Sequence, residues 1–239
     1  MKMKAAFLEE FNQPLVVEER ELAPLKNGEV LVRIKAAGVC GSDVHMWKGK
    51  DPRTPLPLIL GHEGVGVVED VEGEKEDILG KRLYAGDLII WDRGLTCGNC
   101  YFCTVEKEPS LCPKRQVYGI VRDGCYATHL ILLKKTKIIK IEGKVDPAVL
   151  VPASCSGATT AHTIELCNIC QGDTVVIQGP GPMGIFALAF AREKGADKII
   201  AMGTKMDKER LKLCLEFGAS ETLNIDETSF KERLSSIKS

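Results

Sequence analysis

Short apolar segments separated by glycine and proline dominate roughly the first 150 residues of the chain. Apolar runs of this length, bounded by turn-forming residues, are typical of β-strands rather than helices. Gly38, Pro55 and Gly61 are among the residues that separate the runs. The pattern predicts a small barrel-like β domain over residues 1–152, with strands at 30–34, 64–68, 88–91, 128–133 and 137–141.

In the second part of the chain, strand-like and helix-like segments alternate. Gly218 follows a helix-like segment and is placed to end it. Alternation of strands and helices is typical of a parallel sheet. We therefore predict an α/β domain over residues 153–239, with strands at 174–178, 198–202 and 221–225 and helices at 153–166, 185–194, 207–217 and 230–237.

Composition narrows the class of protein. The 239 residues are 44% hydrophobic and 27% charged, with a net charge of -1 at pH 7, as in ordinary globular proteins. So small a net charge gives no field that attracts nucleic acid or an anionic membrane, and we expect neither partner. The sequence contains no apolar run of bilayer length and no signal-peptide pattern at its start, so we expect a cytoplasmic protein.

Four of the ten cysteines lie in one loop with the spacing C-x2-C-x2-C-x8-C: Cys97, Cys100, Cys103 and Cys112. Without a secretion signal, clustered C-x2-C steps indicate metal binding more often than disulfides. Four thiolates are the ligand set of a closed, structural zinc site. Free or disulfide-bonded thiols are the alternative, but this repeated spacing favours zinc.

A second group of candidate ligands is dispersed along the chain. Cys40 opens the string Cys-Gly-Ser-Asp-x-His, and His62 lies in Gly-His-Glu-Gly-x-Gly. A catalytic zinc keeps three protein ligands and one open position, and Cys155 is well placed to be the third ligand. Singly, a cysteine can be a small buried apolar residue and a histidine can be structural. The two strings together favour an open, catalytic zinc site.

The segment Gly179-Pro-Gly181-Pro-Met-Gly184 fits the pattern G-x-G-x-x-G. The pattern alone is weak, but here it follows a predicted strand and opens a predicted helix, as dinucleotide binding requires. The glycines allow a tight turn and close approach of a pyrophosphate, which the N-terminus of the helix would bind. A plain strand–turn–helix junction is the alternative.

Cofactor preference is expected to depend on the end of the second strand of this domain. NAD-binding folds normally have an acidic residue there, but this chain has Gly203, followed by Thr204 and Lys205. A hydroxyl and a cation can bind a 2′-phosphate, so we expect a preference for NADP or acceptance of both cofactors. The alternative is that Asp207 turns toward the ribose and serves NAD.

These motifs resemble the zinc-dependent medium-chain alcohol dehydrogenases, and the resemblance runs through essentially the whole chain. It implies a GroES-like β-barrel catalytic domain followed by an incomplete Rossmann domain, two zinc ions per chain, and hydride transfer between an alcohol or polyol and NAD(P). It also implies that Cys97, Cys100, Cys103 and Cys112 form the structural-zinc lobe, and that Cys40, His62 and Cys155 hold the catalytic ion.

The same resemblance implies roles for five other residues. Glu63 would lie beside the catalytic zinc, as a neighbouring group or an exchanging ligand. Asp43 would orient His62 through its other ring nitrogen. Ser42 and His45 would relay the proton of the substrate hydroxyl to solvent, and Thr159 would contact the nicotinamide side of the cofactor.

The chain has about three strands of the six in a full dinucleotide-binding fold. Three interpretations follow at this point: a truncated or interrupted dehydrogenase, a metal-binding remnant without catalysis, or one piece of a split enzyme completed by a second, C-terminal polypeptide. A homo-oligomer is also compatible with the sequence. The substrate is expected to be a small-molecule alcohol or polyol, without further definition.

Overall fold

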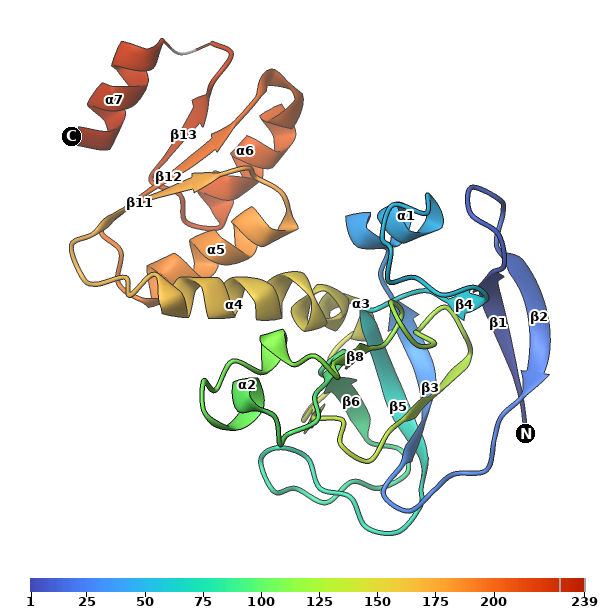
Figure 1. Cartoon of the computed structure of the whole chain (residues 1–239). Coiled ribbons are helices and arrows are strands. Elements are labelled where there is room, and N and C mark those ends of the chain that lie inside the picture. Colours follow the sequence, from blue (N-terminus) through green and yellow to red (C-terminus); the bar gives the residue numbers. More distant parts are fainter. Residues whose placement is uncertain (228, 239) are drawn as a thin grey trace. The chain divides into compact units, whose positions relative to one another are not determined.

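The computed structural model describes residues 1–227 and 229–238, and the chain divides into two units between Cys155 and Ser156 (Figure 1). The sequence prediction placed this boundary slightly earlier, after Pro152. The shift matters for the site, because Cys155 is the last residue of the first unit. Each unit is described by itself.

The first unit is built around a five-stranded antiparallel sheet. Each of the five apolar runs predicted from the sequence forms one of its strands. In sheet order these are β10 (Ile138–Lys140), β6 (Leu88–Trp91), β5 (Gly64–Val71), β3 (Val30–Ala37) and β9 (His129–Leu132). Alternate residues point inward, so that Val30 and Val32 are fully buried in a core around Tyr118.

A second sheet of the first unit consists of β2 (Val16–Glu21), β1 (Lys2–Leu8) and β4 (Leu58–Ile59). A bridge between Ala5 and Ala127 joins it to the segment that leads into β9. The backbone N–H of Ile34 in β3 donates to Thr128 in that same segment, at 2.9 Å. The two sheets are therefore linked side by side, although they do not form one closed ladder among the described residues.

The segments between the strands, where the sequence pattern predicts turns, contain short helices, 3₁₀ turns and one short strand pair. They are the helices α1 (Gly41–Trp47), α2 (Tyr101–Thr104) and α3 (Pro147–Leu150), the 3₁₀ turns η1 (Pro109–Leu111) and η2 (Val151–Ser154), and the strand pair β7 (Gly94–Leu95) and β8 (Gln116–Val117). Several of these elements carry the candidate site residues.

The second unit contains the predicted parallel sheet, with strand order β11 (Thr174–Gln178), β12 (Lys198–Gly203) and β13 (Glu221–Asn224). Its helices are α4 (Ser156–Leu166), α5 (Pro182–Glu193), α6 (Lys208–Glu216) and α7 (Phe230–Lys238), with the 3₁₀ turn η3 (Lys205–Asp207). Figure 1 shows α4 and α5 running beside each other. The core of the unit joins Leu188 of α5 and Leu211 of α6 to Ile199 and Ala201 of β12.

The α/β prediction for the second unit is confirmed. The helix at 185–194 begins earlier than predicted, at Pro182, because a proline is favourable in the first turn of a helix. No helix in the described part of the chain is long and apolar enough to cross a membrane.

Candidate metal centres and nucleotide loop

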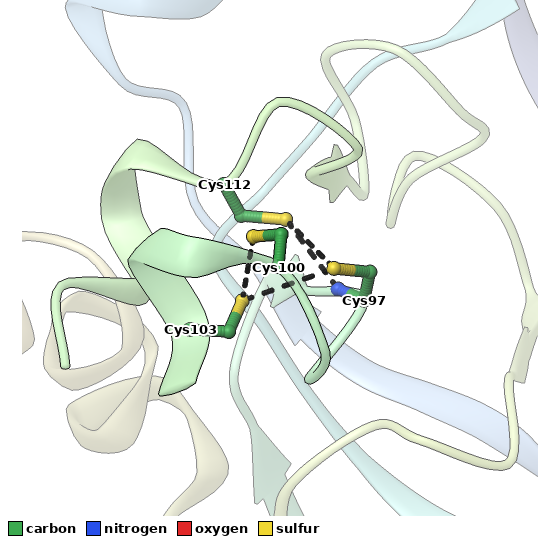
Figure 2. Close-up of side chains that lie close together, drawn as sticks. All are labelled: Cys97, Cys100, Cys103 and Cys112. Carbon is green, nitrogen blue, oxygen red and sulfur yellow. Dashed lines mark hydrogen bonds between the residues drawn. The ribbon is translucent and has the colours of Figure 1, made fainter. Parts of the chain in front are cut away.

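The four cysteines of the loop point toward one another (Figure 2). Their sulfur atoms all lie within 4.8 Å of one another. The Sγ–Sγ distances are 3.6 Å for Cys97 and Cys112, 3.5 Å for Cys100 and Cys103, and 4.0 Å for Cys97 and Cys103. Tetrahedral ligands at a Zn–S distance of about 2.3 Å lie about 3.8 Å apart, whereas a disulfide requires about 2.0 Å. The arrangement fits a metal and excludes disulfides.

Local structure brings these sulfur atoms together. Cys100 is the N-cap residue of α2, which contains Cys103, and Cys112 follows the turn η1. The backbone N–H of Cys97 donates to the Cys112 sulfur at 3.4 Å. The backbone N–H of Asn99 contributes most to lowering the pKa of the Cys97 thiol, to about 6. A lowered pKa favours the thiolate, which is the form of cysteine that binds a metal ion.

The second group of candidate ligands also converges. The ligand atoms of Cys40, His62, Glu63 and Cys155 lie within 4.8 Å of one another, and all but Cys40 are buried. Cys40 is the N-cap residue of α1, His62 and Glu63 directly precede β5, and Cys155 follows η2. Three separate loops of the first unit thus meet at one point.

A glycine holds the loop that carries His62. Gly61 has a φ of +94°, a conformation that favours glycine. Its carbonyl oxygen would lie 2.2 Å and 2.1 Å from a Cβ placed on Gly119 and on Gly124. Only glycines permit this close approach, and the backbone next to His62 is fixed as a result.

The imidazole of His62 is oriented by Asp43. Nδ1 lies 3.2 Å from Oδ1 of Asp43, and Oδ2 of this carboxylate accepts the backbone N–H of Cys40 at 2.8 Å. Burial alone would lower the pKa of His62, but hydrogen bonding to Asp43 and the proximity of Cys155 raise it to about 10. Nε2 is buried, has no hydrogen-bond partner among the described residues, and faces the cluster.

An orphaned imidazole nitrogen beside two thiols is the chemistry of a metal ligand, since buried polar atoms otherwise find partners. Zinc prefers nitrogen and sulfur donors of this kind. The residues therefore fit a zinc ion. Gly38 leaves the space for Glu63, because a Cβ there would lie 2.4 Å from Oε2 of Glu63.

The structure adds a residue that the sequence analysis missed. Nη1 of Arg93 donates to Sγ of Cys155 at 2.8 Å. Arg93 lies in the link between β6 and β7, outside every motif, and no pattern in the sequence identifies it.

Ser42 and His45 both lie exposed on α1. Oγ of Ser42 is 3.9 Å from Sγ of Cys40, which puts this hydroxyl next to the cluster. Both residues line a cavity of about 500 Å³ whose other walls are Lys50, Asp51, Pro52, Arg53 and Ile120. In the described part of the chain no hydrogen bond joins the Ser42 and His45 side chains directly.

The glycine loop of the second unit joins β11 to α5. Gly181 is the N-cap residue of α5, and the space around it is open. A Cβ on Gly184 would lie 2.0 Å from the carbonyl oxygen of Gly179, so only glycine allows the helix to pack this closely on the turn. Thr159 is exposed on α4, while its neighbour Thr160 donates to the carbonyl of Met183 at 3.4 Å.

The end of β12 forms a capped turn. Oγ1 of Thr204 donates to Oδ2 of Asp207 at 2.8 Å, and the Thr204 backbone N–H donates to the same oxygen at 3.1 Å. These bonds lower the pKa of Asp207. The carboxylate is therefore held by its own turn, while Gly203 is buried and Lys205 is exposed.

Comparisons with known proteins agree with this geometry. Residues 26–143 match the model of the alcohol dehydrogenase GroES-like domain. An alcohol dehydrogenase from Geobacillus stearothermophilus is 36% identical over 224 residues, which cover 93% of this chain and 63% of that protein. A solved alcohol dehydrogenase from Thermotoga maritima is 50% identical with a TM-score of 0.95, and the match covers 99% of this chain and 67% of that one.

A third similarity is to a zinc-binding dehydrogenase from Sinorhizobium meliloti whose structure contains NADP. It is 28% identical with a TM-score of 0.85, and the match covers 96% of this chain and 64% of that one. The chain thus spans slightly less than two thirds of the length of the Geobacillus protein. The fold class predicted from the sequence is confirmed, and the chain belongs to the zinc-type medium-chain alcohol dehydrogenase family.

Proposed function

We propose that this protein transfers a hydride between a small-molecule alcohol or polyol and NAD(P), with one zinc ion in each cluster. The observation that carries the proposal is the environment of His62. Its Nδ1 is engaged by Asp43, and its buried Nε2 faces Cys40 and Cys155 and has no hydrogen-bond partner in the part of the chain that the structure describes. Two thiolates and one imidazole are the ligand set known for the catalytic zinc of alcohol dehydrogenases.

In this proposal Cys40, His62 and Cys155 hold the catalytic ion, and Glu63 is a neighbouring group or an exchanging ligand. Zinc bound here would act as a Lewis acid on the substrate oxygen, and NAD(P) would exchange the hydride. Asp43 keeps the proton of His62 on Nδ1, so that Nε2 offers its lone pair to the cluster. Cys97, Cys100, Cys103 and Cys112 hold the second ion, which stabilises their loop.

Ser42 and His45 have the proposed role of moving the substrate's hydroxyl proton. Oγ of Ser42 would accept it and pass its own proton on, and His45 would deliver a proton to the water of the cavity that both residues line. The position of Ser42 beside Cys40 supports the start of this path. The exposure of His45 supports its end.

The second unit has the proposed role of binding the dinucleotide. The N-terminus of α5, reached through Gly179, Gly181 and Gly184, would bind the pyrophosphate. Thr159 would face the nicotinamide. The glycine loop supports this proposal, because its close packing depends on glycine at 184 and leaves open space at 181.

NADP is the proposed preferred cofactor, with NAD also accepted. Gly203 offers no carboxylate at the end of β12, and Thr204 and Lys205 can bind a 2′-phosphate. The competing residue, Asp207, is held by Thr204 rather than free to turn toward a ribose. An NAD preference of about 100-fold or more in kcat/KM would contradict this part of the proposal.

The test combines metal content with turnover. Native mass spectrometry is expected to find two zinc ions on the chain, and an alcohol panel is expected to reduce NADP or NAD. Cys40→Ser should lose one zinc ion and all turnover, while Cys167→Ser, an exposed cysteine outside both clusters, should change neither. A chain with two zinc ions that oxidises no alcohol with either cofactor would contradict the proposal.

A further inference from the structure

The guanidinium of Arg93 places a positive charge next to the proposed catalytic zinc site. Its backbone is fixed, because its carbonyl oxygen accepts the N–H of Tyr118 at 2.9 Å. Its half-buried side chain reaches Cys155, where Nη1 donates to Sγ at 2.8 Å. The guanidinium therefore lies next to one of the residues around the open coordination position.

Most of the hydrogen-bonding capacity of this guanidinium is unused. An arginine has five N–H donors in a planar fork, and the described residues supply Arg93 with one acceptor only, Sγ of Cys155. No carboxylate forms an ion pair with it among the described side chains, not even the nearby Glu63. In a zinc-loaded site the Cys155 thiolate is the anionic partner of Arg93, and the remaining donors of the fork stay available to a ligand.

Two thiolates neutralise a divalent ion, and the Glu63 carboxylate of the same cluster adds one negative charge, which the charge of Arg93 offsets. Charge balance alone therefore accounts for a cation here, but it does not require a fork whose other donors have no acceptor among the described residues. A planar fork is, however, well suited to bind a carboxylate or phosphate through two parallel hydrogen bonds.

The adjoining cavity points in the same direction. Arg53 is neutralised there by Asp51 through bonds of 2.9 and 2.6 Å, but Lys50 has no ion-pair partner in the described part of the chain. Its charged lining is therefore net positive, and this cavity is joined to the cluster through Ser42. A positive cleft raises the local concentration of anionic ligands.

We propose that the substrate carries an oxyanion, a carboxylate or a phosphate, close to its hydroxyl group, and that Arg93 binds this oxyanion. The inference rests on the proposed function and names its substrate class. Arg93 then determines specificity, because a neutral alcohol of the same shape would leave the fork without its acceptor.

The test is equilibrium binding to the zinc-loaded full chain, which needs no turnover. Lactate is compared with 1,2-propanediol, and glycerol 3-phosphate with glycerol. At least one anionic probe is expected to bind more tightly than its neutral partner. Arg93→Gln should lower the affinity for that anionic probe at least about tenfold and leave the affinity for the neutral compounds unchanged. Arg82→Gln, an exposed arginine paired with Glu74, should change nothing.

The two anionic probes distinguish a carboxylate from a phosphate substrate. Zinc content is measured for every variant. If Arg93→Gln does not retain two zinc ions, Arg93→Lys is used in its place, and its loss of affinity for the anionic probe is expected to be smaller. Anionic probes that bind no better than neutral ones would overturn the inference. An Arg93 variant that lowers the affinity for all probes equally would also overturn it, because Arg93 would then only position Cys155.

Turnover with the same four compounds separates this inference from the proposed function. Oxidation of neutral alcohols without any advantage for the anions would retain the function and reject the substrate class. Binding that depends on Arg93, without hydride transfer from any alcohol, would retain the oxyanion site and reject the dehydrogenase.

Discussion

Asp43 lies behind His62, with Oδ1 3.2 Å from Nδ1 of the imidazole and both side chains almost completely buried. The same carboxylate accepts backbone N–H groups from Cys40, at 2.8 Å, and from Gly61, at 3.3 Å. One side chain therefore fixes a ring orientation and two of the loops that bring the cluster together.

Replacing Asp43 tests this relationship. In Asp43→Asn the amide oxygen can accept from Cys40, but the amide nitrogen cannot accept from His62. Zinc affinity of the catalytic cluster is expected to fall by about 10- to 100-fold, the usual effect of removing a group that orients a ligand. Competition with a chromophoric chelator measures it. Asp70→Asn on the exposed end of β5 is the control, and an unchanged affinity in Asp43→Asn would refute the role.

Loss of one cysteine from the loop should destabilise the first unit without affecting the other cluster. Cys112→Ser is expected to reduce the zinc count from two to one. A metal that closes a loop of this length resembles a cross-link worth about 3 kcal/mol of unfolding free energy. Denaturant unfolding measures the loss, with Cys167→Ser as the control. A variant that keeps two ions would show that Cys112 is not a ligand.

The pH dependence of the catalytic cluster follows from the pKa of His62, which is raised to about 10 in the metal-free chain. At neutral pH the metal-free imidazole is therefore protonated on both nitrogens, and zinc must displace the proton on Nε2 while Asp43 keeps the one on Nδ1. Zinc affinity should thus rise with pH, and proton release should accompany binding. Calorimetry in buffers of different ionisation enthalpy counts the protons. Zinc binding to His62→Gln should release fewer of them.

The metal-free chain should show the opposite trend in stability. A raised pKa means that the folded state holds the proton more tightly than the unfolded state does, where the pKa is about 6.5. The contribution of His62 is thus complete below about pH 6.5 and is lost as pH rises toward 10. Unfolding of the chelator-treated protein between pH 6 and 10 tests this. A stability that increases over this range and is unaffected by His62→Gln would contradict it.

Two glycines of the nucleotide loop should respond differently to alanine. Gly184→Ala brings a Cβ to 2.0 Å from the carbonyl of Gly179, so it should destabilise the second unit and weaken NAD(P) binding. Gly181→Ala meets open space at a φ of -77° and should leave stability unchanged. Gly181→Ala should nevertheless weaken cofactor binding, because the methyl group would occupy space that the pyrophosphate needs. Thermal unfolding and cofactor titration together separate the two effects.

Sequence reasoning succeeded where the signal is local. Strands β6 and β11 were predicted to the residue, because their apolar runs end at turn-forming residues. Strand β2 was missed because its side chains are largely exposed, and pairing with β1 rather than burial defines it. The four loop cysteines could be grouped by spacing alone, and the structure brings them together.

Contacts between distant segments were harder to predict. Cys40, His62 and Cys155 could be nominated from motifs and family resemblance, and the structure brings their ligand atoms together with Glu63. The contact between Arg93 and Cys155 could not be predicted, because it depends on where the link from β6 to β7 passes in space. The catalytic and relay roles of the individual residues stay predictions.

The two clusters also differ in when they can form during folding. Cys97 and Cys112 are close in sequence, so four thiolates can gather around an ion in a chain that has not yet folded, at little cost in loop entropy. Cys40 and Cys155 are far apart in sequence, so closing the chain between them costs more entropy, and we expect them to meet only once the first unit has folded. Metal loading is therefore expected to be sequential, with the loop filled first, and zinc-starved synthesis should yield molecules that have a folded lobe but an empty catalytic cluster.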